Sequence, residues 1–151
     1  MAETKSNLYR EIEASLLSLL EGETDEVVKM AETAAVLQER MGFFWTGFYR
    51  VNGNELLLGP FQGPVACVHI PFGRGVCGTA WKEDSTQVVP DVEQFPGHIA
   101  CSSLSKSEIV VPIRRGGKVV AVLDIDSKEL GTFDSTDAQC LERIMSAVFG
   151  V

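Results

Sequence analysis

The spacing of apolar residues predicts two amphipathic helices at the start of the chain. Over residues 8–20, leucine and isoleucine recur at intervals of three and four, and Gly22 follows as a helix terminator. A second helix is predicted to begin at Thr24, which can serve as its N-cap. Its buried stripe is predicted to comprise Val28, Ala31 and Ala35. The two small alanines would let a neighbouring helix approach closely, which would permit a homodimer.

From residue 43 the pattern becomes that of β-strands. Residues 43–51 are aromatic and β-branched, Asn52-Gly53 is typical of a tight hairpin turn, and a strand returns over 55–58. Further strands are predicted at residues 65–70, 87–89, 108–113 and 118–125. Two irregular regions interrupt them: a glycine-rich loop that opens a short helix over 73–81, and a loop over 92–104. A closing helix is predicted from Asp134 onward.

Because hairpins dominate the strand order, these elements predict an α+β fold with a central antiparallel sheet and helices packed on one face. Nothing in the sequence resembles an internal repeat or a linker, so residues 1–151 are predicted to form one domain.

Composition narrows the range of functions. Apolar residues make up 45% of the chain, which indicates a folded core, and the net charge of −8 argues against nucleic-acid binding. No segment approaches the roughly 20 apolar residues needed to span a bilayer. The first residues lack the apolar core of a signal peptide, so a cytoplasmic location is expected.

Three cysteines stand out against this background. Cys67, Cys77 and Cys101 lie in segments rich in glycine, proline or serine. Because the cytosol keeps structural thiols reduced, clustered loop cysteines favour redox chemistry over disulfide staples. Cys140 differs, since it lies beside apolar residues of the closing helix and is expected to be an inert core thiol.

Carboxylates form the second candidate feature. Asp124 and Asp126 are two apart on a predicted strand, so their side chains share a face, and Glu108 begins the adjacent strand. Like charges side by side are unfavourable unless a cation or a proton lies between them. The ammonium group of a free amino acid would be such a cation. The alternative is a solvated outer face of an edge strand. Trp45 and Tyr49, four apart on a strand, could form an aromatic wall.

The predicted layout resembles the GAF domain, a ligand-binding fold whose pocket is roofed by loops. Its motifs are similar to those of the free methionine-(R)-sulfoxide reductase family over nearly the whole chain. The segments that carry this resemblance are FFWTGFY (43–49), GPFQG (59–63), GRGVCG (73–78), DV (91–92), HIACSS (98–103), SEIVVP (107–112) and LDIDS (123–127).

The resemblance implies thiol-dependent reduction of free L-methionine (R)-sulfoxide, without a cofactor and with thioredoxin as reductant. A thiolate that attacks a sulfoxide becomes a sulfenic acid, which a second thiol converts to a disulfide. By resemblance Cys101 attacks, Cys67 is the principal resolving residue and Cys77 an additional partner. Glu108, Asp124, Asp126, Trp45 and Tyr49 would line the pocket; which carboxylate holds the ammonium and which polarises the sulfoxide oxygen stays open.

Other readings compete with this one. Cys67 with His69, and His98 with Cys101, offer four potential zinc ligands, but their spacing is not that of a zinc finger, and no metal is expected. A GAF-type sensor of a small ligand, or a thiol redox sensor without turnover, would use the same fold. Against the small-ligand sensor, the chain stops at Val151, so no attached output domain is expected, and the three cysteines would have no role in ligand binding.

Overall fold

The computed structural model describes residues 4–99, 101 and 103–150. Its helices are α1 (Lys5–Leu19), α2 (Glu26–Met41), α3 (Gly75–Glu83), the short 3₁₀ helix η1 (Val92–Gln94) and α4 (Ser135–Phe149). Its strands are β1 (Trp45–Asn52), β2 (Glu55–Gln62), β3 (His69–Pro71), β4 (Gln87–Val89), β5 (Ser107–Arg115) and β6 (Lys118–Ser127). The strands form one antiparallel sheet in the order β3-β2-β1-β6-β5-β4.

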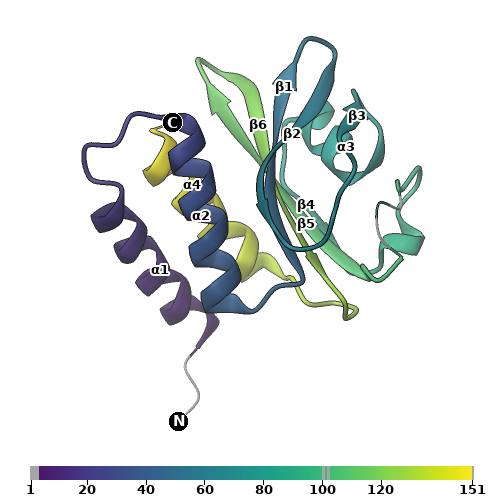
Figure 1. Cartoon of the computed structure of the whole chain (residues 1–151). Helices are drawn as coiled ribbons and strands as arrows, with labels where there is room; N and C mark the ends of the chain where they lie inside the picture. The colour runs from purple at the N-terminus through teal and green to yellow at the C-terminus, as the bar shows by residue number, and fades with distance from the viewer. Residues whose placement is uncertain (1–3, 100, 102, 151) are drawn as a thin grey trace.

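Helices α1, α2 and α4 cover one face of the sheet, and α3 with the irregular segments lies on the other (Figure 1). The helix-covered face holds the larger hydrophobic core, to which the strands contribute Phe48, Ile109, Leu123 and Ile125. This architecture confirms the predicted α+β class and antiparallel sheet. Among the described residues, none of the helices is both long and apolar enough to cross a membrane.

The opposite face carries a second apolar cluster, built around Trp45, Tyr49, Val110 and Val122. Successive side chains of β6 point to opposite faces of the sheet, so the strand contributes to both clusters. Leu123 and Ile125 point into the helix-side core, whereas Asp124 lies among residues of the other face. Since β6 lies in the middle of the sheet, between β1 and β5, its acidic residues do not occupy a solvated edge strand, which rules out the alternative weighed from the sequence.

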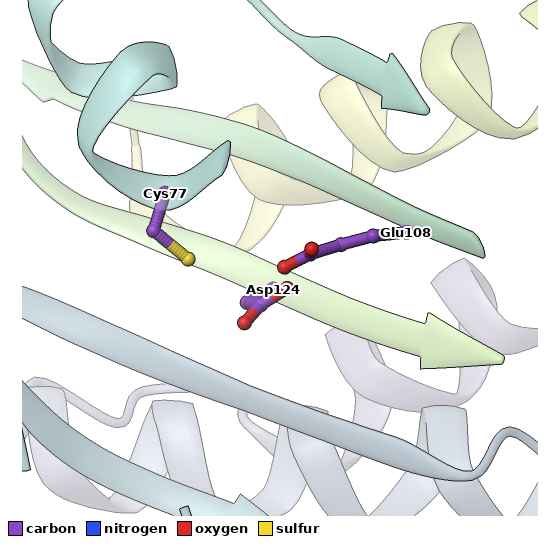
Figure 2. Close-up of side chains that lie close together, drawn as sticks. All are labelled: Cys77, Glu108 and Asp124. Carbon is purple, nitrogen blue, oxygen red and sulfur yellow. The ribbon is translucent and has the colours of Figure 1, made fainter. Parts of the chain in front are cut away.

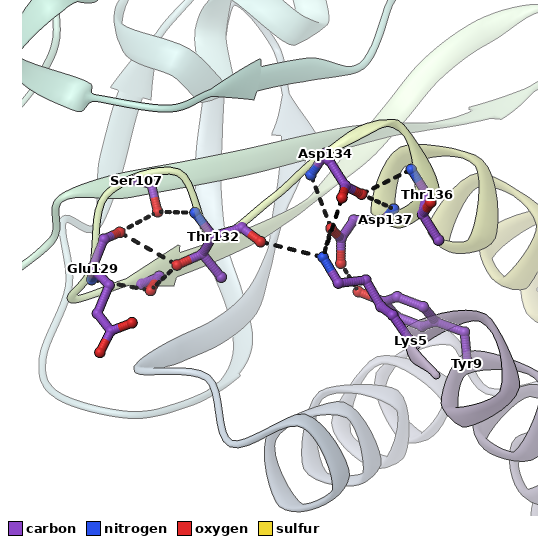
Figure 3. Close-up of polar contacts among 9 residues, drawn as sticks. Lys5, Tyr9, Ser107, Glu129, Thr132, Asp134, Thr136 and Asp137 are labelled. Carbon is purple, nitrogen blue, oxygen red and sulfur yellow. Dashed lines mark hydrogen bonds and ion pairs between the residues drawn. The ribbon is translucent and has the colours of Figure 1, made fainter. Parts of the chain in front are cut away.

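A buried polar network ties the first helix to the last (Figure 3). Asp137, in the first turn of α4, accepts hydrogen bonds from the Tyr9 hydroxyl at 2.6 Å and the Lys5 ammonium at 2.7 Å. Asp137 also closes a capping box with Asp134, because each side chain accepts a backbone N–H of the other residue. The buried carboxylate of Asp137 is thus both neutralised and hydrogen bonded.

Two predictions about the second helix are wrong. Its N-cap is Asp25, not Thr24, because the Asp25 carboxylate accepts the N–H groups of Val27 and Val28. The buried stripe is also rotated from the predicted one, and Val28 is 40% exposed. The residues that α2 buries are Met30, Thr33, Ala34 and Leu37. Ala31 and Ala35 are only partly buried.

The third strand is shorter than predicted, covering His69–Pro71 instead of residues 65–70. The preceding segment leaves the sheet because its contacts are made with the pocket side. Tyr49 donates its hydroxyl to the Cys67 carbonyl at 2.9 Å, and Val65 is 88% exposed. The predicted loop over 92–104 contains the short helix η1, and β2 continues to Gln62, four residues beyond the predicted end.

Candidate active site

The candidate site is a cavity on the face of the sheet opposite α1, α2 and α4. It has a volume of about 50 Å³. Strands β1, β5 and β6 supply its floor, α3 one wall, and the segments before β3 and before β5 its rim. Its lining includes Trp45, Tyr49, Cys77, Cys101, Glu108, Asp124 and Asp126, which are all the site residues predicted from the sequence except Cys67.

Trp45 and Tyr49 form an aromatic wall, as their spacing predicts. Their rings stack with centroids 6.0 Å apart, and both side chains are buried. The Trp45 indole N–H donates to the Pro64 carbonyl at 2.9 Å, which fixes the ring. Gly47 lies between them on the strand and must lack a side chain, because a Cβ there would come within 2.6 Å of the Trp45 ring.

The three carboxylates converge from two neighbouring strands. Glu108 on β5 is paired across the ladder with Asp126 on β6, and Asp126 is paired with Trp45 on β1. Asp124 lies two residues before Asp126 on the same face, next to Glu108 and Cys77 (Figure 2). Glu108 and Asp124 are 7% and 5% exposed, so they are far more buried than isolated carboxylates usually are.

Burial controls the charge of this group. Loss of solvation and the neighbouring charges of Asp124 and Asp126 raise the pKa of Glu108 well above its ordinary value. Burial, together with the charge of Asp124, raises the pKa of Asp126 well above its ordinary value. Burial raises the pKa of Asp124 as well, but hydrogen bonding to Glu108 and Cys77 opposes it. Burial thus favours the protonated form of each of the three carboxyl groups.

Cys77 lies in the first turn of α3 and is buried. Burial, followed by the charges of Asp124 and Glu108, raises the pKa of its thiol well above the ordinary value. A helix N-terminus would favour a thiolate, but here desolvation and the two acidic neighbours dominate. Burial thus disfavours the thiolate form of Cys77 in the free protein.

Cys67 and Cys101 form a disulfide, with their Cα atoms 5.5 Å apart. Cys101 lines the cavity and is exposed, whereas Cys67 is partly buried and is not one of the lining residues. Of the serines expected to surround Cys101, Ser105 also lines the cavity, and Ser102 lies outside the described residues. The bond joins the two cysteines to which the family resemblance assigns attack and resolution.

Two cationic or potentially cationic residues of the lining were not predicted as substrate-binding residues, although His98 had been considered as a zinc ligand. Arg74, the N-cap residue of α3, and His98, three residues before Cys101, both border the cavity. Burial lowers the pKa of His98, and the charge of Asp124 opposes that change. The sequence contained a weak signal for both, since each lies in a glycine- or cysteine-containing loop segment.

The zinc ligands considered from the sequence are not gathered into one site. Cys67 and Cys101 are joined to each other, and His69 is exposed and contacts Glu55 at 2.7 Å. Cys140 lies in the helix-side core and is 5% exposed, as expected for an inert thiol.

The cavity therefore combines a redox-active cysteine pair at its rim, an aromatic wall, and buried acids that can bind a cation or donate a proton. The GAF domain family model matches residues 21–148, so the chain is a GAF-domain protein.

Comparison with individual proteins places it more narrowly. It is 43% identical to the free methionine-R-sulfoxide reductase of Escherichia coli, with 94% of this chain and 87% of that protein aligned. The crystal structure of free methionine-R-sulfoxide reductase from Neisseria meningitidis, in complex with its substrate, is 53% identical and superposes with a TM-score of 0.95. That alignment covers 98% of this chain and 90% of the other. GAF domain-containing protein A of Dictyostelium discoideum is 51% identical over 94% of this chain and 90% of its own length. The chain belongs to the free methionine-R-sulfoxide reductase family, and is an oxidoreductase.

Proposed function

We propose that this protein reduces free L-methionine (R)-sulfoxide to L-methionine. The observation that carries the proposal is the Cys67–Cys101 disulfide at the rim of a cavity whose floor holds three acidic side chains. A reductase that recycles through an intramolecular disulfide needs two thiols within bonding reach, and one of them must face the substrate. Cys101 lines the cavity, and Cys67 is bonded to Cys101.

The reaction requires one thiolate and one proton for its first step. The Cys101 thiolate attacks the sulfoxide sulfur, the S–O bond breaks, and the oxygen leaves on Cys101 as a sulfenic acid while methionine is released. The proton comes from one of the acidic residues whose pKa is raised by burial, Glu108 or Asp126. Cys67 then displaces hydroxide from the sulfenic acid, which forms the disulfide and water.

The charges of the cavity fit an unmodified amino acid. The substrate ammonium would neutralise the acidic cluster around Asp124, and Trp45 would contact the methyl group and methylene chain. The substrate carboxylate needs a cation, and Arg74 and His98 border the same cavity. A peptide bond would remove both substrate charges, so methionine sulfoxide within a protein should be a poor substrate.

The disulfide is returned to thiols by an external dithiol, for which thioredoxin in the cytoplasm is the proposed donor. Its cysteine would attack the exposed side of the disulfide, and Cys77 offers an alternative internal route. Pairing of two copies through the partly buried alanines of α2 is part of the same proposal.

Stereospecific turnover tests this function. With thioredoxin and its reductase, or with dithiothreitol, the protein should consume free L-methionine (R)-sulfoxide and leave the (S) epimer largely unreacted. A protein that forms the disulfide but produces no methionine would instead be a redox sensor, and the proposal would fail.

A further inference from the structure

The cluster of Cys77, Glu108 and Asp124 has a composition that suits a second kind of ligand (Figure 2). One ligand atom from each side chain, a sulfur and two carboxylate oxygens, can be chosen so that all lie within 4.8 Å of one another. Ligand atoms around a tetrahedral zinc ion are about 3.5 Å apart, given bond lengths of about 2.0–2.3 Å. Small side-chain rotations would therefore bring the three atoms onto one ion.

The burial of the cluster provides a second, independent observation. One carboxylate oxygen of Asp124, Oδ1, is buried and has no hydrogen-bond partner among the described residues. No lysine or arginine in the described part of the chain forms an ion pair with Asp124 or Glu108. A buried oxygen without a partner is costly, and a cation bound to it would remove that cost.

We infer that Cys77, Glu108 and Asp124 form an inhibitory site for a thiophilic divalent cation of the zinc class, which occupies the position of the substrate ammonium. The thiolate ligand selects zinc over magnesium or calcium, which prefer oxygen ligands alone. The cavity of about 50 Å³ has room for the ion and for a water molecule as fourth ligand.

Zinc binds as a cation to thiolate and carboxylate, the same negatively charged groups that would attract the substrate ammonium. Binding of the ion does not depend on the proposed function, but its inhibitory effect does, because it requires the ammonium to bind at the same carboxylates.

Cobalt(II) provides a direct probe, because a cobalt–thiolate bond produces an intense charge-transfer absorption that oxygen ligands do not. The protein is used with the Cys67–Cys101 disulfide intact, so that Cys77 and Cys140 are its free thiols. Titration should give this band at a stoichiometry of one ion, and added zinc should abolish it. Cys77→Ser should lose the band, and Cys140→Ser, a matched buried thiol, should keep it.

Glu108→Gln keeps the thiol and the fold but removes one carboxylate, and it should weaken cobalt binding by at least about tenfold. Absence of the band in the parent protein, or its persistence in Cys77→Ser, would overturn the inference.

Inhibition is measured separately. Zinc should raise the apparent KM for the free sulfoxide without changing kcat, and a chelator should reverse the effect; inhibition independent of substrate concentration would refute the inhibitory role. If no turnover occurs at all, the proposed function fails while the cobalt result still decides the ion site.

Discussion

The two faces of the sheet differ in whether their buried carboxylates have a cationic partner. On the helix-covered side, Asp137 is paired with Lys5 and receives the Tyr9 hydroxyl, so its charge is compensated. On the cavity side, Glu108 and Asp124 are equally inaccessible but lie against each other and a thiol. The first arrangement stabilises the contact between α1 and α4, whereas the second raises the pKa of its members and leaves an oxygen unpartnered.

This difference separates a structural acid from a functional one. Replacement of a compensated acid should lower the free energy of unfolding and leave catalysis unchanged, because its buried partners lose their ion pair or hydrogen bond. Replacement of an uncompensated acid should have the reverse effect, because crowding of like charges is relieved while a catalytic group is lost.

The largest expected effect distinguishes the cysteines of the two faces. Cys101→Ser should lower methionine formation by at least about 1,000-fold even in a single turnover, because serine cannot serve as a sulfur nucleophile. Cys140→Ser, in the helix-side core, should retain near-parental activity. Cys67→Ser should form one equivalent of methionine and then recycle slowly. Equal loss in a single turnover at residues 67 and 101 would contradict the assigned roles.

The next effect concerns the acids of the cavity. Asp126→Asn keeps the shape of the side chain but removes its charge and proton, so activity should fall by at least about 100-fold. Its thermal midpoint should stay the same or rise. Asp124→Asn and Glu108→Gln should behave similarly. Parallel measurements of turnover and melting decide the matter, and near-parental activity in all three variants would remove the carboxylates from the mechanism.

A change on the helix side should affect stability alone. Tyr9→Phe keeps the packing of the ring but removes the hydroxyl that Asp137 accepts at 2.6 Å. The free energy of unfolding should fall by about 2 kcal/mol, as expected for a hydrogen bond to a charged group. Urea denaturation measures this loss, and kcat of the folded variant should be unchanged. A variant of full stability but reduced kcat would show that the network acts on the site.

The smallest effect is a pH dependence of stability. Folding raises the pKa of Glu108 and Asp126, so the folded state holds protons that the unfolded state releases above about pH 4. Their contribution to stability is therefore complete at acidic pH and is lost as the pH rises through the folded-state values. Thermal midpoints of Glu108→Gln should decline less between about pH 5 and 8 than those of the parent; parallel profiles would argue against the raised pKa.

Local rules were sufficient to predict much of this arrangement. The two-residue period of a strand places Asp124 and Asp126 on the face opposite Leu123 and Ile125, and the hairpin places Glu108 beside them. Asn52-Gly53 likewise predicted the first turn, and the structure has it between β1 and β2.

The failures arise where distant contacts override local preference. The apolar segment 65–70 favours a strand, but the disulfide joins Cys67 to Cys101 and the Tyr49 hydroxyl donates to the Cys67 carbonyl, and the strand begins only at His69. Arg74 and His98 meet at the cavity only because two separate loops converge there, which no periodicity in the sequence encodes. The phase of the buried stripe on α2 was also missed, because Val28 and Ala34 are both apolar and only packing decides which one is covered.

If uncompensated carboxylates in the cavity select a free ammonium group, two substrates that differ only in that group should differ strongly in turnover. The specificity constant kcat/KM is measured for L-methionine (R)-sulfoxide and for its N-acetyl derivative, which lacks only the amino charge. Loss of a buried charge pair should lower kcat/KM by at least about 100-fold for the acetylated compound. In Asp124→Asn and Asp126→Asn, the ratio of the two constants should approach one as activity on the free amino acid falls. Equal constants for both compounds in the parent protein would show that the carboxylates do not select the ammonium group.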